Sequence, residues 1–142
     1  MKLRIRGNSI RLRLGQSEVE RMVEQGFVEE FTTFDIARRQ RLEYVLRSSD
    51  DAKEVAATFD EGRLVVRIPA EQIRAWASTD QVGIEAFQKV SEDETLRILV
   101  EKDFECIDAP VHESQADAFP RPTTGIACST ASGDYPDDTS TD

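Results

Sequence analysis

The fold of this chain is decided by its first stretch, MKLRIRGNSIRLRL at residues 1–14. Within it, 2–6 and 10–14 alternate strictly between apolar and basic side chains. A period of two is typical of a β-strand with one buried face. The residues between the two runs, Gly7 to Ser9, tolerate the backbone angles of a tight turn. The opening therefore predicts a β-hairpin with one apolar face and one basic face.

A helix and a second pair of strands follow this hairpin. Apolar side chains at helical spacing predict a helix that opens at Ser17 and is capped by Gly26. Two strands are expected at 28–34 and 42–47, and the connection between them is basic. The first half of the chain is thus predicted to be ββαββ.

The second half repeats this order of elements. An offset of 54 residues aligns 2–50 with 56–104 without a gap, and the agreement lies in apolar positions rather than in identical residues. Trp76, at an apolar helical position, is expected to pack in the core. The matched pairs include Leu12/Val66, Met22/Trp76, Val28/Val82 and Leu46/Val100.

These patterns predict an α+β fold in one domain over 1–106, built of two ββαββ units in a pseudo-twofold arrangement. Eight mostly antiparallel strands and two helices would form either packed sheets or a closed barrel. A second apolar set points to the opposite strand faces. The helices or another subunit would cover this apolar set. A second copy of the chain, forming a homodimer, is therefore a possible partner. This second set comprises Phe31, Val45, Val65, Phe87 and Leu99.

The end of the chain differs from this body in composition. The protein has 142 residues and a net charge of −10, from 18 basic and 28 acidic side chains. Residues 105–142 hold eight of the acidic side chains, one basic side chain and four of the five prolines. Such a stretch buries little apolar surface, so 107–142 is expected to be a disordered acidic tail.

Charge and hydropathy argue against nucleic-acid binding, membrane association and secretion. A strongly acidic chain is not drawn to nucleic acid or to an anionic membrane, so neither is expected as a partner. No run approaches the roughly 20 apolar residues that span a bilayer, and the basic start lacks the apolar stretch of a secretory signal. Cys106 and Cys128 lie near or beyond the end of the patterned region, and a reducing cytoplasm is the expected compartment.

Two long motifs carry a resemblance. The first is the opening 1–14, and the second is LRILVEKDF at 96–104. Together with the Phe119-Pro120 pair near an acidic end, they resemble a family of small bacterial proteins of unknown function over most of 1–122. The resemblance implies a bacterial, cytoplasmic setting and no mechanism.

The main candidate site is the basic face of the opening hairpin. Guanidinium groups on neighbouring strands can bind phosphate groups through paired N–H donors. The alternative is a solvated strand face whose charges are balanced by Glu29, Glu43 and the acidic tail. The candidate side chains are Arg4, Arg6, Arg11 and Arg13, with Lys2 beside them.

Catalytic and metal chemistry have less support in the sequence. Glu30 falls in the apolar column of its strand, so it lies either at a strand end or buried beside a partner such as Arg13 or Arg67. A buried Glu30 would be the best candidate for a functional carboxylate. His112 is the only histidine, and with the carboxylates near Cys106 it does not complete a metal site. No phosphate-binding loop or nucleophile motif occurs, and neither a metal nor a cofactor is expected.

The sequence therefore favours a binding or interaction module, with an unidentified protein as partner, over an enzyme. Two alternatives stay open. One is an anion- or phosphate-binding protein that uses the basic hairpin, and the other is a hydrolase-like enzyme with a carboxylate site near Glu30.

Overall fold

The alternating hairpin of residues 1–14 forms the first two strands of the structure, and three more hairpins follow it. The computed structural model describes residues 1–105 and 114–121. The order of elements confirms the predicted pair of ββαββ units. In chain order the elements are β1 (Lys2–Arg6), β2 (Ser9–Leu14), α1 (Gln16–Gln25), β3 (Phe27–Thr33), β4 (Arg41–Ser49), β5 (Ala56–Asp60), β6 (Arg63–Pro69), α2 (Ala70–Ser78), β7 (Gly83–Lys89) and β8 (Thr95–Lys102).

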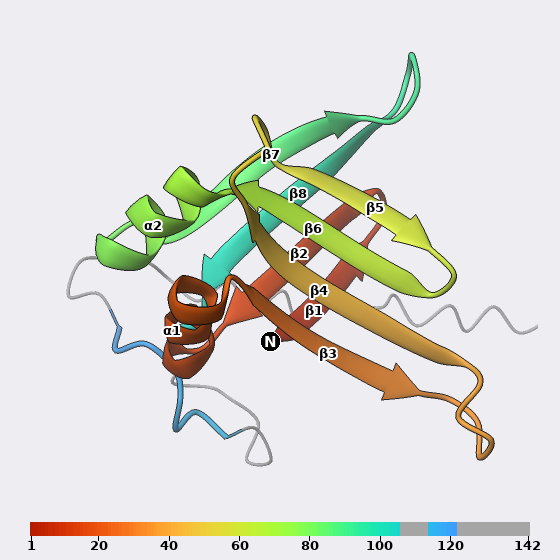
Figure 1. The fold of residues 1–142 in the computed structure, drawn as a ribbon, viewed down its shortest axis with the longest axis horizontal. Helices are drawn as coiled ribbons and strands as arrows, with labels where there is room; N and C mark the ends of the chain where they lie inside the picture. Colours follow the sequence, from red (N-terminus) through yellow and green to blue (C-terminus); the bar gives the residue numbers. More distant parts are fainter. Residues whose placement is uncertain (106–113, 122–142) are drawn as a thin grey trace, which may run out of the picture.

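The strands form two four-stranded sheets, and each sheet takes one hairpin from each half of the chain (Figure 1). Sheet A has the order β1-β2-β8-β7, and sheet B has the order β3-β4-β6-β5. The outer pairs are antiparallel, whereas the central pairs β2–β8 and β4–β6 are parallel. The predicted α+β fold is confirmed as packed sheets rather than a closed barrel, and each half needs the other to complete both sheets.

Both central pairings obey the same 54-residue offset. Leu12 pairs with Val100 in sheet A, and Val66 pairs with Leu46 in sheet B. The offset converts the first pair into the second, with the two halves exchanging places. This is the pseudo-twofold arrangement expected from the sequence.

Strand β7 departs from the predicted gapless offset by two residues. The partner of Val100 is Ile84, so Ile84 and not Val82 occupies the position equivalent to Val28. The carbonyl of Val82 instead accepts a hydrogen bond from the Trp76 indole (3.1 Å) in the connection that precedes the strand. Because side chains alternate with a period of two, this shift keeps the inner face of β7 apolar.

One core fills the space between the inner faces of the sheets and one side of each helix. The predicted inward positions Leu12, Leu46, Val66 and Val100 are all fully buried. Trp76 is also fully buried, as its place in the helical pattern predicted. Removal of this apolar surface from water is what holds the two sheets together.

The helices do not cover the outer faces of the sheets, because both helices lie at one end of the molecule (Figure 1). Of the second apolar set, Val45 is buried and Val65 and Leu99 are half-buried, but Phe31 and Phe87 are 62% and 66% exposed. The expectation that the helices cover this set is therefore wrong.

All four hairpin turns lie at the end opposite the helices, the turn end (Figure 1). The topology requires this, because each helix connects the end of one hairpin to the start of the next at the other end of the sheets. Neither helix of the described residues has the length and apolar character that crossing a membrane demands.

Residues 114–121, part of the tail predicted from composition, lie against the body of the domain. The Phe119 N–H donates to the Asp103 carbonyl (2.7 Å), and the rings of Phe104 and Phe119 lie with centroids 5.9 Å apart. The rest of the predicted tail lies outside the described residues, so its disorder stays a prediction.

Asp117 caps the first turn of α1 from outside the helix. Its carboxylate accepts hydrogen bonds from the Ser17 backbone N–H (3.0 Å) and hydroxyl (2.6 Å). Gly15, the N-cap residue, has no side chain for this role. A Cβ at Gly15 would lie 2.8 Å from the Asp117 carbonyl oxygen, so the glycine makes room for the segment that supplies the cap.

Replacing Asp117 tests this cap. The Asp117→Ala substitution is expected to lower the free energy of unfolding by about 1 kcal/mol. The two Ser17 hydrogen bonds lower the pKa of Asp117, the hydroxyl bond most, below its ordinary value of 3.8. The stabilisation is therefore present above pH 3.8 and fades as the pH falls through the lowered pKa of the folded state.

Urea unfolding of both proteins, at neutral pH and below pH 3.8, checks the expectation. The difference between wild type and Asp117→Ala should shrink in acid. Asp51→Asn, which changes an exposed carboxylate in the β4–β5 connection, serves as the control. Equal unfolding midpoints for wild type and Asp117→Ala at neutral pH would show that Asp117 does not cap the helix.

Candidate functional site

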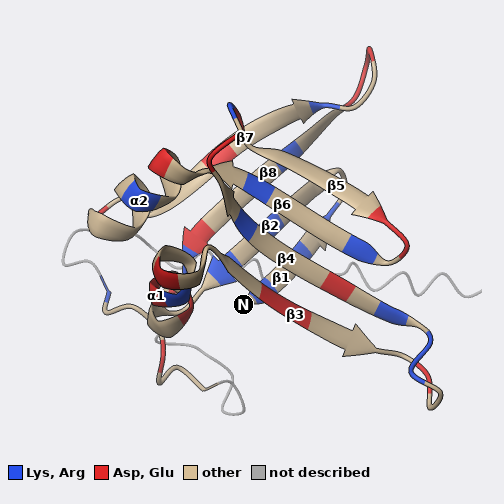
Figure 2. Ribbon diagram, in the orientation of Figure 1, with Lys and Arg blue, Asp and Glu red and all other residues tan. Residues whose placement is uncertain are grey.

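Five arginines share the outer face of sheet A, and three strands supply them. Figure 2 shows the basic segments of these strands in blue. Residues paired across two strands point to the same side of a sheet. Arg4 pairs with Arg11, and Arg6 pairs with Ser9, while β8 places Arg97 on the other side of Ser9. This set, the arginine face, consists of Arg4, Arg6, Arg11, Arg13 and Arg97.

A hollow of about 310 Å³ lies on the arginine face. The structure brings the predicted residues Arg4, Arg6 and Arg11 together around it. Arg13 does not line the hollow, and its Nε lies 3.5 Å from a carboxylate oxygen of Glu101. The lining residues are Arg4, Arg6, Ser9, Ile10, Arg11, Arg97 and Leu99.

Carboxylates orient two of the arginines that line the hollow. Arg11 donates from Nε (2.7 Å) and Nη2 (2.6 Å) to Oε2 of Glu101. Arg97 donates from Nε to Oε1 of Glu85 (2.5 Å). A guanidinium group has five N–H donors, so one carboxylate does not use all of them.

Arg4 and Arg6 are exposed and form no ion pair with any residue in the described part of the chain. Of the balancing carboxylates suggested by the sequence, Glu29 and Glu43 are elsewhere, and most of the acidic tail lies outside the described residues. Glu29 and Glu43 lie on sheet B, where Glu43 pairs with Arg63 (3.6 Å). Within the described part of the chain, Arg4 and Arg6 therefore bring positive charge without an ionic partner to the hollow.

Arg97 and Phe87 also belong to this region, and neither residue was predicted to lie on the basic face. Phe87 is the cross-strand neighbour of Arg97, on the same side of sheet A. Alternation in the strand around Arg97 indicated that this side chain points outward. Its position beside Ser9 could not be inferred, because that depends on the parallel pairing of strands from opposite ends of the sequence.

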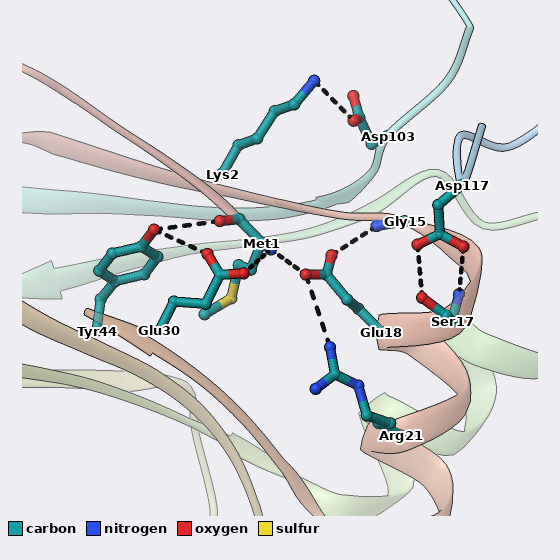
Figure 3. A network of polar contacts seen from close by, with 10 residues as sticks. All are labelled: Met1, Lys2, Gly15, Ser17, Glu18, Arg21, Glu30, Tyr44, Asp103 and Asp117. Atoms are coloured by element: carbon teal, nitrogen blue, oxygen red, sulfur yellow. Dashed lines mark hydrogen bonds and ion pairs between the residues drawn. The ribbon is translucent and has the colours of Figure 1, made fainter. Parts of the chain in front are cut away.

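Glu30 lies in a polar network around Met1 (Figure 3). One carboxylate oxygen is 3.0 Å from the Met1 amino group, and the other accepts a hydrogen bond from the Tyr44 hydroxyl (2.9 Å). Arg13 and Arg67, the partners expected from the sequence, are on the outer faces of the sheets, whereas Glu30 and Tyr44 share an inner face. The predicted pairing of Glu30 with an arginine is therefore wrong.

Glu18 completes the network. It pairs with the Met1 amino group, and its second oxygen accepts a hydrogen bond from the Gly15 N–H (2.9 Å) at the start of α1. Arg21 lies 3.9 Å from the same carboxylate. Glu18 and Glu30 thus join the first residue, the first helix and sheet B, and neither lines the hollow of the arginine face.

The pKa of Tyr44 is raised in this network. Burial, and then the hydrogen bond to Glu30, raise the pKa of Tyr44 from 10.0 to about 12. Both effects disfavour the charged phenolate, because the phenolate would be less hydrated than in water and would be repelled by the Glu30 carboxylate. The network therefore favours a neutral Tyr44 that donates its proton to a hydrogen bond.

The end of β8 and the residues after it form no metal site among the described residues. Glu101 and Asp103 pair with basic side chains of sheet A, and the Lys102 ammonium donates to the Thr79 carbonyl (2.6 Å). Across 1–105 and 114–121, no group of three His, Cys, Asp or Glu side chains could hold a metal ion. The other residues considered from the sequence, Cys106, Cys128 and His112, lie outside these ranges.

The chain belongs to DUF7009, a family of unknown function whose model matches residues 1–123. This match confirms the resemblance to an uncharacterised family. No curated protein and no solved structure matches the chain. The family description names no activity, so a function has to be argued from the geometry of the site.

The polar network predicts the titration of Tyr44. The chain has two tyrosines, so Tyr135→Phe leaves Tyr44 as the single titrating phenol. Its ionisation, followed by ultraviolet absorbance, is expected at about pH 12. Glu30→Gln in the same background should lower that value, because the carboxylate is gone. Ionisation near pH 10 in the folded protein would contradict the network.

The same shift affects stability in base. The folded state holds the Tyr44 proton more tightly than the unfolded state between pH 10 and about 12, so this contribution to the free energy of unfolding falls as the pH rises through that window. Urea unfolding above and below pH 10 should show this loss in wild type and a smaller loss in Tyr44→Phe.

Proposed function

We propose that this protein is a cytoplasmic binding module that holds a small phosphate-bearing molecule on its arginine face. The supporting observation is that Arg4 and Arg6, without ionic partners in the described part of the chain, share a hollow with the oriented arginines Arg11 and Arg97. Guanidinium groups donate paired N–H bonds that match the oxygens of a phosphate. The proposal is for binding and includes no catalytic step.

The pseudo-twofold fold offers an internal comparison for these arginines. On sheet B, the offset of 54 residues places Thr58 and Asp60 at the positions of Arg4 and Arg6. The counterpart of Arg97 there is Glu43. The same backbone arrangement therefore forms without arginines at these positions, which favours a role in binding over a need of the fold.

The size of the hollow and the charge of the chain narrow the class of ligand. About 310 Å³ falls at the lower end of the range of small-molecule sites. A net charge of −10 opposes a long nucleic acid, whereas a small anion feels mainly the nearby arginines. Phe87 adds an exposed apolar ring beside Arg97, which suits a ligand that carries a ring as well as phosphate.

Removing Arg4 and Arg6 tests the proposal. The double variant Arg4→Gln/Arg6→Gln is expected to weaken binding of pyrophosphate or a nucleoside diphosphate by at least tenfold. A hydrogen bond to a charged group is worth about 1.5–3 kcal/mol, and 1.4 kcal/mol corresponds to tenfold. Isothermal titration calorimetry with full-length protein at low and moderate salt measures the change.

The matched control is Arg63→Gln/Arg67→Gln, which removes the same charge from the outer face of sheet B. This variant should change the affinity by less than about twofold, because distant charges are screened. Equal losses in the two double variants would mean that only overall charge matters. Absence of phosphate binding by wild type, or equal losses, would refute the proposed function.

A further inference from the structure

Exposed apolar side chains are concentrated at the turn end of the molecule. Of the nine large apolar residues that are exposed in the described part of the chain, seven lie in the half that ends in the hairpin turns. Ile36, in the β3–β4 connection, is 104% exposed. Phe31 and Phe87 lie on the outer faces of opposite sheets, whereas Ile36 and Val90 lie in the connections themselves. The seven residues are Ile5, Phe31, Phe34, Ile36, Phe59, Phe87 and Val90.

Two of the connections at this end carry opposite charge. The β3–β4 connection, residues 34–40, contains Arg38 and Arg39 and one acidic residue, Asp35, whose carboxylate accepts a hydrogen bond from the Gln40 N–H (2.9 Å); this net-positive segment is the basic tip. The β7–β8 connection, residues 90–94, is the acidic tip, whose charged side chains are Glu92, Asp93 and Glu94. Figure 2 shows the two tips projecting apart, the basic tip mainly blue with one red segment and the acidic tip red.

The charges of the two tips are not neutralised within the described part of the chain. Among 1–105 and 114–121, Arg38, Arg39 and the three acidic residues of the acidic tip form no ion pair. Each tip also presents an exposed apolar side chain, Ile36 on the basic tip and Val90 on the acidic tip. The two surfaces thus match in apolar character and oppose each other in charge.

The pseudo-twofold symmetry makes the tips counterparts of each other at the two sides of the turn end. If a second copy is rotated by half a turn so that the turn ends meet, each basic tip faces an acidic tip. If the second copy were turned the other way, the two basic tips would face each other and so would the two acidic tips. Such a contact is isologous and closes as a dimer, because both tip-to-tip contacts form at once. Ile5 and Phe59, also related by the 54-residue offset, lie beside the β1–β2 and β5–β6 turns at the same end.

We propose that two copies of this chain associate through their turn ends, with the basic tip of each copy against the acidic tip of the other. Charge complementarity selects this alignment, and burial of apolar side chains around Ile36 and Val90 stabilises it. This proposal is independent of ligand binding at the arginine face. The dimer is therefore expected in the absence of phosphate.

A charge exchange between the tips tests the proposal. Arg38→Glu/Arg39→Glu leaves two acidic tips on each copy, and Glu92→Lys/Glu94→Lys leaves two basic tips. Each variant alone should be a monomer, whereas an equimolar mixture should form a heterodimer with an affinity at least tenfold above that of either variant alone. Sedimentation velocity on full-length protein measures this, since wild type should reach twice the 16.0 kDa chain mass and should dissociate as salt rises.

The matched control is Glu20→Lys/Glu24→Lys, which reverses two exposed charges of α1 at the far end of the molecule. This variant should dimerise as wild type does. A wild type that stays monomeric at every concentration in low salt would refute the dimer. Variants that dimerise alone, or a mixture that does not, would refute the proposed alignment of the tips. Arg4→Gln/Arg6→Gln should still dimerise, so the dimer and the phosphate site can fail separately.

Discussion

The rest of the structure depends on the contact between the inner faces of the two sheets. Neither half of the chain makes a complete sheet, because each sheet takes one hairpin from each half and joins them at a central parallel pair. Leu12 and Val100 meet along one of these pairs, and Val66 and Leu46 meet along the other. The same burial that holds the sheets together therefore also holds the two halves together.

Because the inner faces carry the stability, the outer faces are free to differ between the two sheets. Equivalent outer positions carry Arg4 in sheet A and Thr58 in sheet B, and the pair Arg97 and Glu43 shows the same divergence. The two tips follow the same rule, with arginines on one and carboxylates on the other. The phosphate site and the dimer are both proposed at positions where the two halves differ. Charged residues at such positions are not required by the fold, so a role in binding explains them better.

Local patterns in the sequence predicted most of the fold and part of the candidate site. Alternation and helical spacing identified the eight strands, two helices and inward columns, and placed Arg4, Arg6 and Arg11 on one face. Features that depend on distant pairing could not be read in this way. Arg97 joins the site only through the parallel contact of β2 and β8. The two-residue shift of β7 does not change which side chains face the core, so the apolar pattern could not reveal it. The Asp117 cap joins residues about a hundred positions apart in the sequence, which local patterns do not predict.

Native-state hydrogen exchange of the central strands tests the shared core most directly. If the two sheets depend on each other as described, the slowest amides of β2 and β8 and those of β4 and β6 should exchange with one common opening free energy. That value should equal the free energy of global unfolding measured in urea. If one sheet opened several kcal/mol below the other, the two sheets would be independent units, and the account of a single core built from both halves would be contradicted.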